Sequence, residues 1–151
     1  MADTIRHRIL QALVEHIEAH EFVTTNSIPV NPGKTRYRPE DLPAISVFAR
    51  TEEADLDRYG RQQCSLSVEI NYAGVIDRDA EGEKTSILDQ IETVRGKLLD
   101  ALVTATLNDI ADPPVYTGGV VEYPSEEDMA FVASVEGRID YETDLQDPYT
   151  Q

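Results

Sequence analysis

The chain has 151 residues, enough to bury the core of one domain but too few for two comfortable ones. It carries 29 acidic against 13 basic side chains, and its formal net charge of -16 opposes the phosphate neutralisation on which nucleic-acid binding depends. We therefore expect neither DNA nor RNA as a specific ligand. An apolar fraction of 40% and clear periodicities favour a folded chain over a disordered acidic one.

Localisation follows from what the sequence lacks. There is no basic segment followed by an apolar run at the N-terminus, and no apolar stretch is long enough to cross a bilayer. The single Cys64 cannot form an internal disulfide, so we expect a buried, inert thiol in a reducing compartment. These features predict a protein made in the cytoplasm, which leaves it only as part of a particle.

The N-terminal segment predicts an amphipathic helix from residue 3 to about residue 20. Apolar side chains recur there every four residues, and either Asp3 or Thr4 can cap the start. Residues 24–42 follow and are rich in proline, asparagine and glycine, which predicts an extended loop with one short strand around 28–30.

The extended loop contains the only basic cluster of this acidic chain. It consists of Lys34, Arg36, Tyr37 and Arg38. One interpretation is a solvated loop, and the other is an arm that docks on the acidic surface of a neighbouring subunit. We take these four residues as the candidate subunit interface.

Four main strands are predicted, at 43–50, 64–72, 115–123 and 129–141, with a bend or bulge at Gly118 and Gly119 in the third. In the first of them the apolar residues are not confined to one face, since Ile45 and Val47 are on the opposite phase to Phe48. An acidic turn over 52–57 should separate the first two. The strand at 64–72 has one apolar face only, which favours antiparallel pairing. The strand at 129–141 would run to about 40 Å and outreach the core of a domain this size, so we expect another subunit to cover its overhang.

A second helix is predicted between an acidic loop at 74–85 and Asn108, with Ser86 and Asp89 as a capping box. The fold class is therefore α+β: a mostly antiparallel sheet with two helices packed on one face, in the order α-β-β-(β)-α-β-β. We assign residues 1–142 to one domain and residues 143–151 to a polar tail.

Two patterns imitate metal sites without completing them. Residues 77–82 resemble the start of a calcium loop, but Leu88 stands where a bidentate glutamate is needed, so a solvated acidic loop is favoured. His16 and His20 are four residues apart and could face one ion, but a position near a helix C-terminus, where the helix dipole favours histidine, is the preferred explanation. No nucleophile elbow, phosphate-binding glycine loop or cysteine and histidine pairing is present, so we assign no catalytic, cofactor or metal residues and expect no enzyme.

The order of elements and the C-terminal stretch VYTGGVVEYPSEEDMAFVASVEGRIDYETDLQDPY resemble the tail terminator (tail completion) proteins of long-tailed bacteriophages. The resemblance implies an α/β subunit, six of which form a ring. It further implies that the ring caps the tail tube and gives the head and neck connector proteins a surface to join. The partners would be further copies of the chain, the tube protein and the connector, and DNA would only pass through the channel.

Two other classes of function stay open on the sequence. A free acidic binding module could occupy a basic surface of a host protein, and a small carboxylate-metal enzyme is a more distant alternative.

Overall fold

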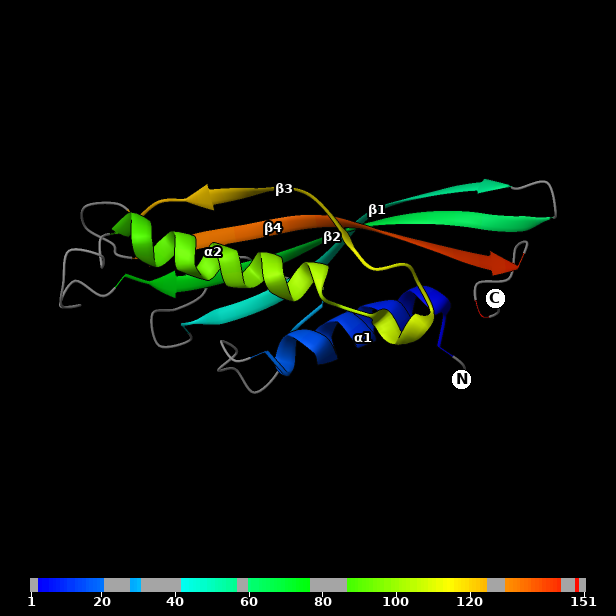
Figure 1. Ribbon diagram of the computed structural model, residues 1–151, viewed down its shortest axis with the longest axis horizontal. Coiled ribbons are helices and arrows are strands. Elements are labelled where there is room, and N and C mark those ends of the chain that lie inside the picture. The colour runs from blue at the N-terminus through cyan, green and yellow to red at the C-terminus, as the bar shows by residue number, and fades with distance from the viewer. Residues whose placement is uncertain are drawn as a thin grey trace.

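The computed structural model describes residues 3–20, 28–30, 42–56, 60–76, 87–124, 130–144 and 149. The elements are α1 (Ile5–Glu18), β1 (Ala44–Leu56), β2 (Arg61–Val75), α2 (Ile87–Val103), the short turn η2 (Leu107–Asp109), β3 (Val115–Glu122) and β4 (Ala130–Asp144). The four strands form one antiparallel sheet in the order β1-β2-β4-β3. Both helices lie on the same side of this sheet (Figure 1), so the predicted α+β class is confirmed.

The predicted first helix is confirmed, with its end at Glu18. Thr4 is the N-cap, because its side-chain oxygen accepts a hydrogen bond from the backbone N–H of His7 at 3.1 Å. This contact satisfies one of the N–H groups that the first turn leaves unpaired. The buried side chains of α1 recur at helical spacing on one face and point to the sheet: Ile5, Ile9, Leu10, Ala12, Leu13 and Ile17.

β1 is longer than the sequence predicted, and the acidic turn expected at 52–57 is wrong over residues 52–56. These residues continue the strand and pair with β2 from Glu52 opposite Leu66 to Leu56 opposite Gln62. A β-bulge between Ala49 and Glu52 separates the two parts of the strand. Acidic residues are common both in turns and on exposed edge strands, so the composition of residues 52–56 could not distinguish the two.

β4 confirms the long closing strand and extends further than its alternation indicated. It continues through Asp144 and thus includes the first two residues of the stretch that we assigned to a polar tail. Thr143 is buried there and lies opposite Gln62 of β2, so pairing holds this polar end in the sheet. The short strand expected around 28–30 is reduced to a single bridge, in which Val47 N donates to Pro29 O at 3.0 Å.

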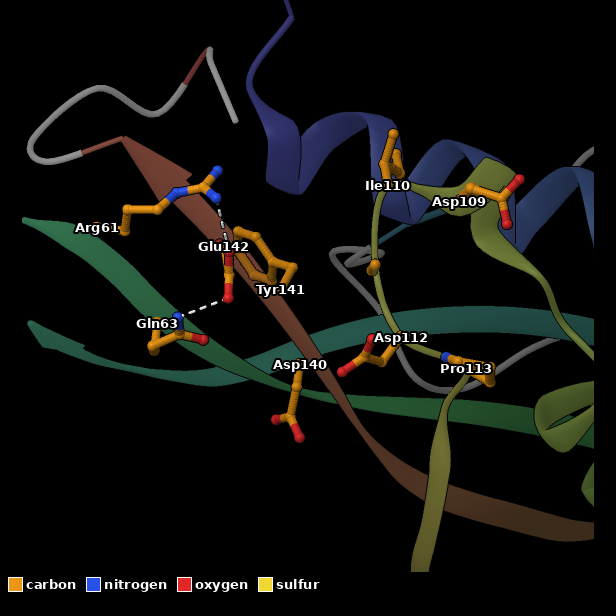
Figure 2. Close-up of a pocket in the computed structure, with 10 residues that line it drawn as sticks. Arg61, Gln63, Asp109, Ile110, Asp112, Pro113, Asp140, Tyr141 and Glu142 are labelled. Atoms are coloured by element: carbon orange, nitrogen blue, oxygen red, sulfur yellow. Dashed lines mark hydrogen bonds and ion pairs between the residues drawn. The ribbon is translucent and has the colours of Figure 1, made fainter. Parts of the chain in front are cut away.

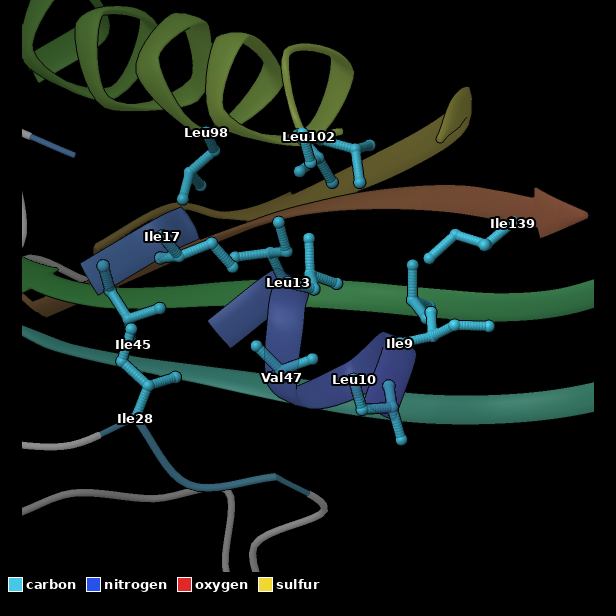
Figure 3. Packing of buried hydrophobic residues seen from close by; sticks show 14 of the residues in the cluster. Ile9, Leu10, Leu13, Ile17, Ile28, Ile45, Val47, Leu98, Leu102 and Ile139 are labelled. Carbon is cyan, nitrogen blue, oxygen red and sulfur yellow. The ribbon is translucent and has the colours of Figure 1, made fainter. Parts of the chain in front are cut away.

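The core fills the space between the helices and the sheet (Figure 3). Val47, Ile70 and Val135 stand in register across three strands and are fully buried. α2 approaches β4 closely, since a Cβ added at Gly137 would lie 2.9 Å from Leu102 Cδ2. Glycine at this position therefore allows the helix to settle on the strand.

α2 ends at Val103 rather than at Asn108, and a left-handed turn follows it. Leu107, Asn108 and Asp109 have φ values of 54°, 54° and 60°. Three successive non-glycine residues in this region are strained. The turn places Leu107 in the core, where its side chain is buried. The proposed cap at Ser86 lies outside the described residues.

β3 confirms the predicted irregularity. Its register against β4 shifts between Tyr116 and Gly118, and Gly118 has a φ of 153°. A Cβ at Gly119 would lie 2.3 Å from the carbonyl oxygen of Ser134, so only glycine fits against the neighbouring strand.

Candidate functional site: the distal end of the sheet

Of the sites considered from the sequence, two lie outside the described residues and one lies within them. Lys34, Arg36, Tyr37 and Arg38 lie outside the described residues, and so does the calcium-like stretch at 77–82. The subunit interface and the acidic loop therefore stay predictions from the sequence.

The two histidines at the end of α1 do lie within the described part, and each contacts its own partner at the end of α2. His16 Nε2 is 3.0 Å from Thr104 Oγ1, and His20 Nε2 is 3.2 Å from Asp100 Oδ2. The ring centroids are 6.3 Å apart. No group of three metal-ligating side chains occurs among the described residues. The pair thus connects the two helices.

The most distinctive surface is an overhang of the sheet, which the length of the closing strand predicted for β4 but which the sequence did not indicate for β1 and β2. Three strands run on past the helices at one end of the molecule (Figure 1). We call this part the distal sheet and define it as residues 50–56 of β1, 61–66 of β2 and 139–144 of β4. Every residue of its β1 segment is exposed, including Leu56, whose relative exposure is 64%. Six carboxylates and two arginines make the distal sheet acidic.

On the helix-facing side, three distal strands bring Glu52, Cys64 and Tyr141 together. Cys64 stands opposite Tyr141 in the register, and the Tyr141 hydroxyl donates a hydrogen bond to Glu52. Burial, together with this hydrogen bond to the carboxylate, holds the pKa of Tyr141 well above its ordinary value. Burial also raises the pKa of the Cys64 thiol, so the expected inert thiol is consistent with its surroundings.

An open depression of about 420 Å³ adjoins this cluster and is lined by Thr4, Arg6, Glu52, Ala54, Gln62, Cys64, Tyr141 and Thr143. Beside the Glu52 carboxylate and two threonine hydroxyls, the lining holds a tyrosine and a thiol whose raised pKa values keep both protonated near neutral pH. Such groups are poor nucleophiles. The cluster therefore fastens three strands to one another.

A second depression, of about 440 Å³, lies where the segment after η2 passes the end of β4 (Figure 2). Glu142 accepts a hydrogen bond from Gln63 Nε2 at 2.7 Å and pairs with Arg61 at 3.1 Å. Asp112 N donates to Asp140 O at 2.9 Å, which attaches this segment to the edge of β4. Four carboxylates and one guanidinium line the depression, so it favours a positively charged surface.

The opposite edge of the sheet has a different character. Along β3, Val115 and Val120 are 49% and 59% exposed, and Tyr123 just beyond the strand is exposed as well. Arg95 donates a hydrogen bond to the hydroxyl of Tyr116 at 2.8 Å and thereby ties this strand to α2. β3 carries no charged residue between Val115 and Val121.

Comparison with known proteins adds no name to this geometry: no protein-family model and no curated protein matches the chain. No helix in the described part is long and apolar enough to cross a membrane. The features that bear on function are therefore the fold, the edges of the sheet and the charge.

Proposed function

We propose that the chain is a structural subunit of a bacteriophage tail, a tail terminator that assembles into a ring on the tail tube. The ring would consist of six copies, stand at the head-proximal end of the tail, and offer a surface to the head and neck connector protein. Its role would be mechanical, without a catalytic step or a cofactor.

The observation that carries the proposal is the open distal sheet. Natural proteins seldom leave a long strand edge exposed in the monomer, because it is a template for pairing with another chain. Here the β1 segment of the distal sheet is exposed along its whole length and stands on an edge strand. A ring of identical subunits would cover such an edge with the next copy.

Charge supports the same proposal. The formal net charge of -16 would give a channel wall that repels the DNA phosphates passing through it. The four basic-cluster residues, Lys34, Arg36, Tyr37 and Arg38, would contact the acidic distal sheet of a neighbour.

The first experiment is absolute mass by light scattering behind a sizing column at several concentrations, with negative-stain images of the main peak. Rings are expected, and they should bind the ends of purified tail tubes. A protein that neither forms rings nor binds tubes would contradict the proposal.

The basic cluster is tested by a double substitution, Arg36→Glu with Arg38→Glu. We expect loss of rings with a nearly unchanged melting temperature, because the change removes attraction to the acidic neighbour. The matched control is Arg8→Glu with Lys97→Glu, which changes the net charge equally at exposed positions on the helices. Rings in both double variants would remove the cluster from the interface.

A free acidic binding module is the second candidate, and the acidic depression beside β4 favours it. A basic partner bound there should dissociate as salt rises, because exposed ion pairs are screened. Asp112→Asn with Asp140→Asn should weaken that binding. If the chain is monomeric and captures a basic host protein in this salt-dependent way, this second function replaces the first.

A further inference from the structure

The distal edge of β1 can be described at the level of single backbone groups. Residues along an antiparallel strand direct their N–H and C=O alternately to one neighbour and to the other. The bond from Asp112 N to Asp140 O shows that the backbone groups of Asp140 point away from β2. Those of Tyr141 must then point toward β2, where Cys64 is its partner.

The same alternation continues across β2. Because Cys64 directs its backbone groups to β4, Ser65 directs its own to β1, where its partner is Glu53. Glu53 and Asp55 are thus the residues that bond β2. The groups facing the outer edge belong to Glu52, Ala54 and Leu56. No described segment pairs with the edge between these residues.

The acids of this edge decide what can pair with it. If two copies met symmetrically through β1, Glu53 and Asp55 would approach the same carboxylates of the other copy. Like charges directly opposite on a sheet are destabilising. A second copy can therefore join this edge favourably only through a different strand.

β3 is the other edge of the same sheet and meets that requirement. The backbone of Val120 is directed to β4, where its N lies 3.3 Å from Ser134 Oγ. The backbone N–H and C=O groups of Gly119 and Val121 therefore point to the open side of β3. The strand is uncharged up to Glu122. Its exposed Val115 and Val120 offer apolar surface that a neighbouring strand would cover.

We propose that the distal edge of β1 in one copy pairs with the β3 edge of the next copy, so that the sheets of adjacent subunits become continuous. This inference rests on the proposed ring, and it names the strands that make the ring's repeating contact. A contact between two different edges is head-to-tail, and it closes into a ring when the rotation between copies allows. Main-chain bonds would supply affinity, as in other strand additions.

The first test blocks one backbone donor. Ala54→Pro removes an N–H that faces outward and leaves the bonds to β2 intact, since proline is tolerated on the open side of an edge strand. Ala54→Thr is the matched control, because it keeps the donor. We expect the proline variant to assemble only at concentrations roughly tenfold or more above those of the threonine variant. Circular dichroism and melting verify that both fold.

The second test uses charge on the β3 side, and it does not depend on proline. Val120 lies on the sheet face away from the helices, as do Glu53 and Asp55. Val120→Glu should therefore weaken assembly about tenfold, whereas Val120→Lys should preserve or strengthen it. Equal assembly of the two variants at the wild-type level would overturn the proposal.

Mixing the two defective variants decides the arrangement. Ala54→Pro keeps a functional β3 edge, and Val120→Glu keeps a functional β1 edge, so together they should form one contact and a dimer. A dimer of Val120→Glu alone would indicate symmetric pairing and overturn the proposal.

Failure here is distinguishable from failure of the proposed function. Wild-type rings that both Ala54→Pro and Val120→Glu leave intact would overturn the edge pairing and keep the ring. A wild-type chain that stays monomeric at every concentration would overturn self-pairing, while tail-tube binding would still test the terminator.

Discussion

The two halves of the sheet share β1, β2 and β4 but differ in their surroundings. Beneath the helices, Val47, Ile70 and Val135 are fully buried, and the sheet owes its stability there to the core. In the distal sheet Leu66 and Ile139 are still buried, but every residue of the β1 segment is exposed, so this edge strand relies mainly on its ladder bonds to β2. β1, β2 and β4 therefore stabilise the fold where they pack under the helices, while the exposed distal edge of β1 is available for association.

The largest expected effect comes from truncating a leucine in the core, compared with the same substitution in the distal sheet. Leu102→Ala should lower the free energy of unfolding by about 2–5 kcal/mol, because it opens a cavity between α2 and Gly137. Leu56→Ala, the matched control in the distal sheet, should change it by less than about 0.5 kcal/mol. Urea unfolding of both variants measures this difference. Similar losses would mean that the distal sheet contributes to the core after all.

A smaller effect is expected at the junction of the halves, on the face away from the helices. Arg50 Nε donates to Glu69 Oε2 at 3.0 Å, and the guanidinium lies 4.9 Å from the centre of the Phe48 ring. The Glu69 side chain is only 10% exposed. Arg50→Ala would leave the Glu69 carboxylate without this partner. We expect the free energy of unfolding to fall by about 1–2 kcal/mol, a value limited by the exposure of Arg50 itself.

Two further variants check the origin of that loss. Arg61→Ala breaks an exposed pair with Glu142 and should cost less than about 1 kcal/mol. Adding Glu69→Gln to Arg50→Ala should recover part of the stability, since no buried charge then remains. If Glu69→Gln instead lowers the stability of Arg50→Ala by a similar amount again, the unpaired Glu69 charge is not the cause of the loss.

Alkaline pH should weaken the distal contacts first. The pKa of Tyr141 is raised in the folded protein from the ordinary value of 10.0, mainly by burial. The unfolded state therefore releases this proton at lower pH than the folded state, so the contribution is fully present below about pH 10 and is lost above it. Cys64 and Tyr72, whose pKa values burial also raises, add to the same trend.

Tyr141→Phe tests this assignment. It should cost about 1 kcal/mol at neutral pH, because the hydrogen bond to Glu52 is lost. The decline of stability above pH 10 should become shallower than in the wild type. Tyr123→Phe removes an exposed hydroxyl and should leave both quantities unchanged. An unaltered alkaline decline in Tyr141→Phe would assign it to other groups.

What could be predicted from the sequence follows the same division. Periodic residues such as Ile9 and Leu13 identified the helices, and the alternation from Cys64 to Tyr72 identified the central strand, because burial imposes a period on the sequence. The distal part of β1 has no such period, since both of its faces are exposed. The contact between Glu52 and Tyr141 joins residues 89 positions apart, and local patterns hold no information on such pairs.

The turn η2 lies between the halves and gives the smallest expected effect. Asp109 is exposed and has a φ of 60°, a conformation that glycine adopts more easily than other residues. Asp109→Gly should therefore raise the free energy of unfolding by about 0.5 kcal/mol, the relief of strain being offset in part by the greater freedom of glycine in the unfolded chain. Thr106→Gly, at an exposed residue with a φ of -94°, should instead lower it by about 0.5–1 kcal/mol. Asp109→Ala removes the same charge and keeps a Cβ in the left-handed conformation, so a gain as large in this variant would show that repulsion among the acids around β4, and not the left-handed turn, limits stability there.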